Sequence, residues 1–298
     1  MIVGALLLVL IGAADIARST LGPGPRRGPV ALVAALVAVV WAAVLVLAAT
    51  GLGVPLGWLA VPLVVALGWL ITTSASAGPG SGPRSRFSRA RALPAVAVVV
   101  ALVASLFWDP LPGGPSGYLV DALAAVPIRA LASLPVVTVV LAVGLALFLV
   151  ESANIVVRSA LRPAMEEVRG VEGDASLTSV GSEAGATATA AVPAAAAPVR
   201  WWSRRRRTEA VVSTPVVEDL RGGRIIGPLE RLLIVALSLA GALPIVAGIL
   251  AAKGIVRFPE ISHDGPGGSK AEYFLVGSLV SWSLAILSAG ALWISTQS

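Results

Sequence analysis

Long apolar runs separated by short polar segments dominate this chain, and the length of those runs predicts its fold. A helix needs about 20 apolar residues to cross a hydrocarbon core about 30 Å thick, with about 17 to 25 tolerated. Runs of this kind, free of charged residues between their ends, cover residues 29–50, 54–71, 92–108, 134–150, 232–252 and 273–293. The pattern predicts an all-α, polytopic transmembrane bundle of about seven spans, or six if a shorter N-terminal run does not cross.

That shorter run covers residues 2–17, and its uninterrupted apolar part ends at Ala14, just before Asp15. At about 1.5 Å per residue it is short for a full crossing, so it either thins the bilayer locally or tilts into the interface. No basic residue precedes it, and Arg18 follows it. A secretory signal carries its positive charge in front, so we interpret the run as a retained, reversed anchor. A cleaved signal ending near Ala13 or Ala14 is the alternative.

Composition narrows the function classes. The 298 residues are 57% hydrophobic and 13% charged, which excludes a soluble globular protein. There is no cysteine, and His263 is the single histidine, so the sequence offers no thiolate nucleophile and no cysteine or paired-histidine metal site. The six long runs carry no ionisable residue between their ends, which argues against proton relays and intramembrane hydrolysis. We therefore expect no catalytic residue, no metal, no cofactor and no enzymatic activity.

The polar segments divide the chain into three regions. Residues 1–150 form an N-terminal transmembrane region with five spans, residues 151–225 a cytoplasmic insert, and residues 226–298 a C-terminal helical hairpin of the spans 232–252 and 273–293. Within the insert, residues 170–199 consist mainly of Ala, Ser, Thr, Gly and Glu without an aromatic residue. Such a segment has too few packing side chains to offset the entropy of ordering, so we expect a flexible linker there.

Basic residues predict the orientation, because Lys and Arg accumulate in short cytoplasmic loops. If seven helices alternate, 18 basic residues fall on one side, in the connections after the first, third and fifth spans, and four fall on the other. Those four are Arg129, Lys253, Arg257 and Lys270. We expect a multi-pass protein of the bacterial cytoplasmic (inner) membrane, with its N-terminus outside and its C-terminus in the cytoplasm.

A basic cluster at residues 200–207 follows the linker. It contains two tryptophans and four consecutive arginines, Trp201, Trp202, Arg204, Arg205, Arg206 and Arg207. Indole rings prefer the headgroup level, and each basic residue near an anionic surface contributes about 1 kcal/mol to membrane binding. We expect contact with anionic lipid headgroups. The alternative is an orientation signal without a specific ligand, and nucleic acid binding is not expected because no recognition module surrounds the cluster.

Two further features concern local structure. Ser116 follows a proline- and glycine-rich turn and can cap a short helix lying at the interface, where it would act as a packing element. In the C-terminal hairpin, Pro244 lies near the middle of the run 232–252 and should bend that helix. Small residues such as Gly248 and Gly277 let helix backbones approach closely, so we expect the two helices of the hairpin to pack tightly.

Polar residues gather at the ends of this hairpin. The chain reads IGPLERLL before its first helix, AAKGIVRFPE at the far end of that helix and KAEYFLVGSLVS at the start of the second. Ser269 and Glu272 have the spacing of a capping box. The tight hairpin would bring Glu272 beside Lys253 and Arg257, either as an ion cluster that closes the hairpin or as part of a ligand site.

These three segments resemble the C-terminal helical pair of uncharacterised bacterial polytopic integral membrane proteins. The resemblance covers about residues 224–298. It implies that the family's polar positions are Glu230, Arg231, Lys253, Arg257, Glu272 and Tyr273, and it implies no activity.

These observations lead to two hypotheses about the class of function. The first hypothesis is a non-enzymatic scaffold, regulatory or partner-binding membrane module, whose charged hairpin ends contact lipid or another membrane protein. The alternative is a carrier or channel for a neutral or weakly polar solute. A dry, closed bundle favours the first hypothesis, and a continuous polar channel favours the second.

Overall fold

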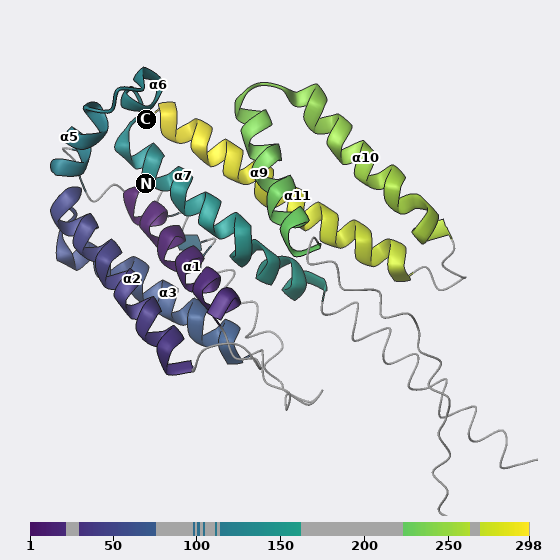
Figure 1. The fold of residues 1–298 in the computed structure, drawn as a ribbon, viewed down its shortest axis with the longest axis horizontal. Coiled ribbons are helices and arrows are strands. Elements are labelled where there is room, and N and C mark those ends of the chain that lie inside the picture. Colours follow the sequence, from purple (N-terminus) through teal and green to yellow (C-terminus); the bar gives the residue numbers. More distant parts are fainter. Residues whose placement is uncertain are drawn as a thin grey trace, which may run out of the picture. The chain divides into compact units, whose positions relative to one another are not determined.

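A computed structural model of the chain describes residues 1–21, 30–75, 114–161, 223–262 and 269–297, together with the single positions 98, 100, 101, 104 and 111. All regular secondary structure in these ranges is helical (Figure 1). Five helices are long and apolar enough to cross a membrane, and they cover Ile2–Leu21, Val30–Gly51, Leu56–Thr73, Val136–Leu161 and Phe274–Gln297. The all-helical fold is confirmed, whereas the expected count of about seven spans is not. Most of the expected span 92–108, the linker 170–199 and the basic cluster 200–207 lie outside the described residues.

Helix α1 (Ile2–Leu21) lies at the centre of the N-terminal helices and packs against α2 (Val30–Gly51), α3 (Leu56–Ala75) and α7 (Val136–Leu147). Its leucines and alanines favour a helix, and most of its residues are buried. The helix is longer than the expected run 2–17 because Asp15 and Arg18 pair with each other and with α3, so neither charge ends it.

Two glycines bring α1 and α7 into close contact. A Cβ atom at Gly12 would lie 2.6 Å from Cβ of Leu147, and one at Gly144 would lie 2.8 Å from the carbonyl oxygen of Ala5. A methyl group fits at neither position without displacing backbone. Small residues that allow such an approach are the usual means of helix packing in lipid. Ala5 lies beside Gly144 and Gly12 beside Leu147, so residue numbers rise together along both helices and α1 and α7 run in the same direction.

The connection before α7 contains two short helices, α5 (Tyr118–Ala124) and α6 (Arg129–Ala132). Helix α5 is a packing element, as expected, since Leu119 lies against Gly51 at the end of α2. The expected cap by Ser116 is wrong: the N-cap residue is Gly117, and no side chain caps the helix. Ser116 instead donates its backbone N–H to the carbonyl of Leu52 at 3.2 Å, because this connection folds back onto the α2–α3 turn.

Helix α7 continues beyond Leu147 through a π-helical turn, η2 (Phe148–Ser152), and then as α-helix to Leu161. In this turn the backbone N–H of Ala153 is directed to the carbonyl of Phe148, five residues earlier instead of four. A π turn interrupts the regular pairing of backbone groups, and such turns occur frequently at functional sites. The hydropathy pattern contains no sign of it.

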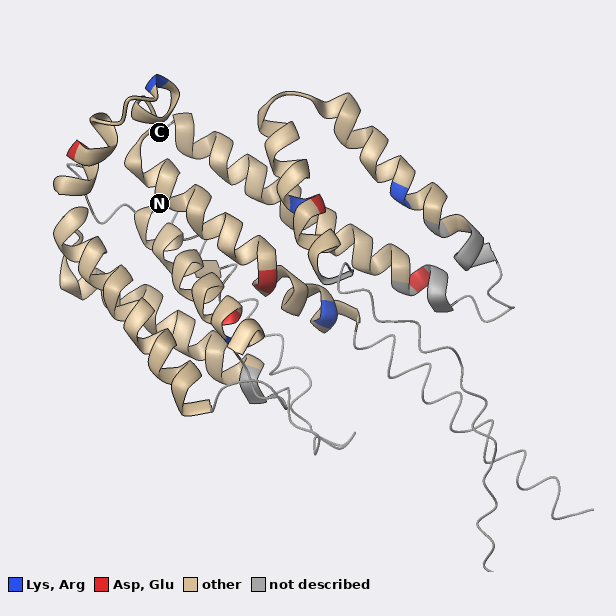
Figure 2. Ribbon diagram, in the orientation of Figure 1, with Lys and Arg blue, Asp and Glu red and all other residues tan. Residues whose placement is uncertain are grey.

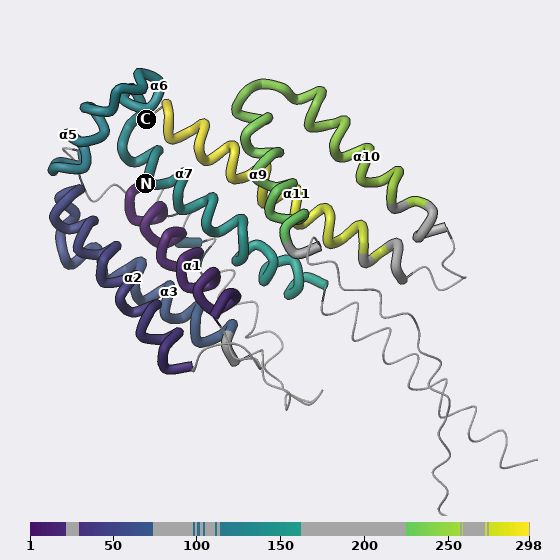
Figure 3. The backbone as a smooth tube through the Cα atoms, in the orientation of Figure 1, coloured from purple at the N-terminus to yellow at the C-terminus, as the bar shows by residue number. Residues whose placement is uncertain are grey.

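The expected helix 232–252 is not a single helix. Helix α9 (Gly223–Leu239) ends in a tight turn, and α10 (Leu243–Ser262) runs back beside it, as the tube in Figure 3 shows. Gly241 has φ of +72°, Ala242 N–H donates to Leu237 O at 2.9 Å, and Gly241 N–H donates to Ser238 O at 3.1 Å. These two bonds form a Schellman motif, which glycine favours because it has no Cβ.

Pro244 therefore lies in the first turn of α10 and does not bend the middle of a helix. Proline fits that position because the first helical N–H groups have no partner within the helix. The expected close approach of helix backbones at Gly248 is also wrong, since a Cβ atom at that position would meet nothing within 4 Å. Gly277 of α11 (Ser269–Gln297) lies beside Leu161 instead, where a Cβ atom on the glycine would be 3.3 Å from Cδ1 of that leucine.

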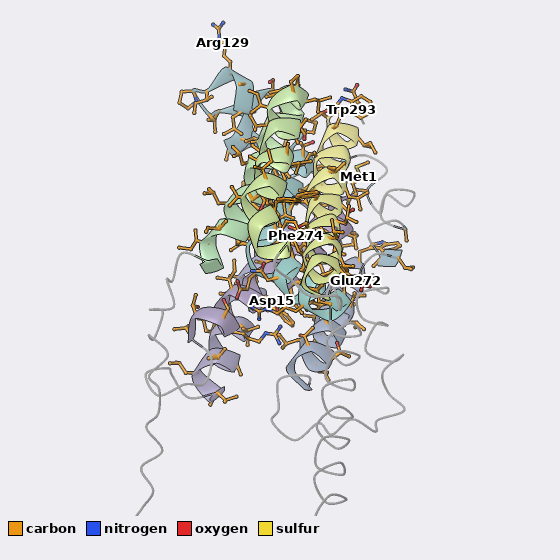
Figure 4. The ribbon with its side chains drawn as sticks, turned by 90° about the vertical axis from the view of Figure 1, so that its right-hand side faces the viewer. Met1, Asp15, Arg129, Glu272, Phe274 and Trp293 are labelled. Atoms are coloured by element: carbon orange, nitrogen blue, oxygen red, sulfur yellow. The ribbon has the colours of Figure 1, made fainter. Side chains whose placement is uncertain are left out.

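Two contacts give the relative direction of α7 and α11. Thr138 near the start of α7 donates to the carbonyl of Ser295 near the end of α11 at 2.9 Å, and Gly277 near the start of α11 lies beside Leu161. These helices are therefore antiparallel. In Figure 1 the N- and C-termini lie at the same end, and in Figure 4 Arg129 and Trp293 lie towards one end while Asp15 and Glu272 lie towards the other. Both termini lie at the same end because the chain reverses direction once more than expected, between α9 and α10.

Candidate functional site

Charged side chains occupy only short stretches of the described helices (Figure 2). Among the described residues, most of the charged side chains that form hydrogen bonds or ion pairs with other side chains gather in two places. We define the N-terminal cluster as Asp15, Arg18, Trp69 and Thr73, on α1 and α3. We define the C-terminal cluster as Asn154, Glu230, Arg231, Lys253, Ser281 and Trp282, which lie on the continuation of α7 and on α9, α10 and α11.

Glu230 is the centre of one half of the C-terminal cluster. Its Oε2 lies 2.6 Å from Nζ of Lys253, and its Oε1 accepts the indole N–H of Trp282 at 2.9 Å. The same ammonium group lies 5.6 Å from the centre of the Trp282 ring. Both carboxylate oxygens are thus engaged, and the ammonium has an anion on one side and an aromatic face on the other. Glu230, Lys253 and Trp282 join α9, α10 and α11.

Arg231 is the centre of the other half and is only 3% exposed. Its Nε donates to Oγ of Ser281 at 2.8 Å. Its Nη1 donates to the carbonyl oxygen of Leu149 at 3.0 Å and to Oδ1 of Asn154 at 2.8 Å. A guanidinium stays charged and presents donors in a planar fork, so a buried arginine requires several acceptors in fixed positions. Arg231 therefore fastens α9 to both α7 and α11.

Asn154 connects this arginine to a second carboxylate. Its Oδ1 must face Arg231, because a guanidinium has no acceptor, and its Nδ2 then donates to Val150 O at 3.1 Å and points to Oε2 of Glu151 at 3.5 Å. Glu151 lies within the π turn. With Glu230 and Lys253 included, two carboxylates and two cations lie in and beside the cluster, so their formal charges balance.

The N-terminal cluster is built in the same way. Asp15 is 1% exposed, pairs with Arg18 one turn later, and accepts the indole N–H of Trp69 at 3.0 Å. Arg18 Nη2 also donates to Oγ1 of Thr73 at 3.0 Å. The Trp69 ring lies 6.5 Å from that of Phe148 on η2. A buried charge is tolerated when it is paired and hydrogen-bonded, and here the pair fixes the end of α1 to α3.

Three of the six polar positions implied by the sequence come together. Glu230, Arg231 and Lys253 belong to the C-terminal cluster, whereas Glu272 is exposed. The side chains of Arg257 and Tyr273 are not among those described. The expected pairing of Lys253 with Glu272 is wrong, because the turn at Gly241 folds α10 back along α9 and brings Lys253 to Glu230.

Several members of both clusters were missed by sequence reasoning. Asp15 and Arg18 lie inside a helix long enough to cross a membrane, so the argument that the spans lack ionisable residues holds only for the runs first chosen. Their three-residue spacing on an apolar run was the available signal. Asn154, Ser281 and Trp282 give no such signal, because partners 50 residues or more away in the chain define their roles.

The chemistry that this arrangement supports is polar contact between helices. In the part of the chain that the structure describes, no three His, Cys, Asp or Glu residues come together as metal ligands. The Ser281 hydroxyl is held by Arg231, which has no basic lone pair and is not a general base. No family model, curated protein or solved structure matches the chain.

Proposed function

We propose that this protein is a non-enzymatic integral membrane module, acting as a scaffold, regulatory or partner-binding subunit. The observation that carries the proposal is that the buried charged groups form hydrogen bonds and an ion pair between neighbouring helices. Both oxygens of Glu230 are engaged by other helices, and the donors of Arg231 reach α7 and α11. Ionisable groups at membrane depth are costly, and here they support a fixed arrangement of α7, α9, α10 and α11.

The membrane orientation is part of the proposal. Whether α9 and α10 cross fully or only enter the bilayer, the turn at Gly241 returns the chain to the end where α7 finishes. The connections at that end, and the helix segments leading into them, then hold 21 of the 22 Lys and Arg residues, and Arg129 alone remains at the other. We therefore place the basic end in the cytoplasm of a bacterial inner membrane, with both termini outside. The proposed orientation therefore differs from the sequence-based expectation of a cytoplasmic C-terminus.

Single cysteines test the orientation, because the chain has none of its own. An impermeant thiol reagent applied to intact cells should label cysteines at Ser116 and Gln297 and should not label one at Ser262. Labelling at Ser262 together with protection at Gln297 would restore the original topology and remove this part of the proposal.

Crosslinking in native membranes tests the module itself. A tagged full-length chain, crosslinked and purified in detergent, should bring down a membrane-protein partner in constant stoichiometry. The matched control is a variant with Arg231→Met, in which the C-terminal helices lose their fastening and recovery of the partner should fall. A chain recovered without partners, and equally so in both forms, contradicts the proposal.

The basic cluster at residues 200–207 adds a lipid-binding role to the proposal. It rests on composition, since these residues lie outside the described ranges. Full-length protein should bind vesicles containing phosphatidylglycerol more strongly than phosphatidylcholine vesicles, and replacing the four arginines by glutamine should remove the difference. Rising salt should weaken the binding, because the attraction is screened over about 8 Å at physiological ionic strength.

A carrier or channel for a neutral or weakly polar solute remains the second candidate. The reversal at Ala240–Ala242 favours it, because a hairpin that enters the bilayer without crossing is tolerated where it is buried in protein or borders a water-filled cavity. Solute flux into vesicles containing the purified protein, absent from protein-free vesicles, would support this candidate against the first.

A further inference from the structure

The ammonium group of Lys253 occupies a specific environment between two helices that are not its own. Glu230 of α9 supplies a carboxylate oxygen at 2.6 Å, and Trp282 of α11 supplies a ring whose centre is 5.6 Å away. An anion on one side and an indole face on the other are the two features by which proteins bind organic ammonium groups.

This carboxylate and indole are held together without help from α10. The indole N–H of Trp282 donates to Oε1 of Glu230 at 2.9 Å, which leaves Oε2 and the ring face directed to the ammonium. Arg231, next to Glu230, fixes α9 to α11 through Ser281 at 2.8 Å. The pair would therefore keep its geometry if Lys253 moved away.

Among its described side chains, helix α10 is attached along a narrow stripe. Val246 is buried and Leu250 and Lys253 are partly buried, whereas Ile255 and Val256 are 72% and 74% exposed. A Cβ atom at Gly248 or Gly254 would meet nothing within 4 Å. The Lys253 side chain is itself 29% exposed. Withdrawal of this lysine thus disturbs few other contacts.

We propose that Glu230 and Trp282 form a binding site for an alkylammonium group, which Lys253 occupies as an internal ligand in the present structure. A ligand of this class, either a soluble amine or the headgroup of an aminophospholipid, enters when Lys253 withdraws with α10. The site goes beyond a scaffold role and does not depend on it, because a module of any function can carry it.

The tethered lysine sets the binding strength. A group held by a short connection competes at an effective concentration in the millimolar range, so a soluble amine binds the native chain weakly. Removing the lysine side chain removes the competitor. A Lys253→Ala variant should therefore bind small alkylammonium ions at least tenfold more tightly than the native chain.

The first experiment measures thermal unfolding of the full chain in detergent with added n-propylammonium. Lys253→Ala should have a lower Tm than the native protein and recover roughly 3 °C at an amine concentration about ten times Kd. Lys253→Met is the matched control, because its side chain removes the charge and still fills the space, so it should not respond. Glu230→Gln combined with Lys253→Ala should not respond either, because the anion is gone.

A second measurement uses the native chain and does not depend on the folding of a variant. The chain has two lysines, Lys253 and Lys270, so their acylation can be compared by mass spectrometry. Propyltrimethylammonium, which cannot itself be acylated, should raise the reactivity of Lys253 relative to Lys270. Unchanged reactivity of Lys253, with no amine response in Lys253→Ala, overturns the proposal and leaves a structural ion pair.

Vesicles distinguish the two sources of the ammonium group. Lys253→Ala in phosphatidylethanolamine vesicles should unfold at a higher temperature than in phosphatidylglycerol vesicles if an aminophospholipid fills the site, and the gain should vanish with Glu230→Gln. A soluble amine as the source predicts equal Tm values in the two lipids and a rise in both when n-propylammonium is added. No amine effect in either lipid contradicts the site.

Discussion

Arg231 on α9 donates from Nη1 to the carbonyl oxygen of Leu149, 3.0 Å away and within the π-helical turn of α7. Where a π turn disturbs the regular pairing of backbone groups, a carbonyl becomes available to a side chain from another helix. The guanidinium also reaches Asn154 and Ser281. One side chain thus links a backbone irregularity to three helices.

Arg231→Met should destabilise the chain more than any other single change in the C-terminal cluster. Two buried acceptors and one part-buried acceptor lose their donor, and leaving a buried group unsatisfied costs about 1–3 kcal/mol before relaxation. We expect a loss of about 3 kcal/mol, measured by denaturant unfolding in detergent micelles. Arg231→Lys should recover only part of it, because an ammonium cannot reproduce the planar fork. Equal stability of native and Met forms contradicts the fastening role.

Replacing two buried serines, Ser281 and Ser152, by alanine should have different effects on stability. Ser281→Ala removes the acceptor for Nε of Arg231 and should cost about 1–2 kcal/mol. The hydroxyl of Ser152 is buried with no hydrogen-bond partner, so Ser152→Ala should be neutral or stabilising. Thermal unfolding of the two variants beside the native chain provides the comparison, and equal losses in both would contradict it.

Replacing Gly144 or Gly248 by alanine should change the stability of the protein in opposite directions. Gly144→Ala places a methyl group 2.8 Å from Ala5 O and should force α1 and α7 apart, at a cost of about 1–3 kcal/mol. Gly248→Ala fills open space and should stabilise α10 by up to about 1 kcal/mol through helix propensity. The difference in Tm between these two variants measures the effect, and its reversal would refute the packing of α1 on α7.

The turn between α9 and α10 should depend on the backbone conformation of Gly241. Gly241→Ala introduces a Cβ at φ of +72° and should cost about 1 kcal/mol, although no neighbour would clash with it. Gly241→Asn should cost less, because asparagine tolerates the left-handed region. Unfolding free energies of the three forms check this order, and an Ala form as stable as the Asn form would speak against strain as the cause.

The sequence was sufficient for the class of fold and insufficient for the helix ends. Apolar runs located the helices around residues 30–51, 56–73 and 274–297, because lipid requires length and hydrophobicity of each. The same reasoning joined residues 232–252 into one helix. Gly241 is a signal for the end of one helix and Pro244 a signal for the start of the next, but a hydropathy pattern does not register either of them.

The candidate site was accessible only in part. Glu230 and Lys253 could be singled out as charges beside apolar runs, yet their pairing depends on the reversal at Gly241. Trp282 could not be distinguished from an interfacial tryptophan, because its role comes from a carboxylate 52 residues earlier in the chain. Contacts of this range follow from the fold, and local pattern carries no information about them.

The Schellman turn at Gly241 also decides which fusion reporters will work. Under the proposed orientation, a reporter joined after Ser298 is exported, so a phosphatase that matures only in the periplasm should become active there, and a fluorescent protein that folds only in the cytoplasm should stay dark. A truncated chain ending at Ser262, the last residue of α10, should reverse both signals. Three residues between two helices thus determine the compartment in which everything attached to the C-terminus must fold.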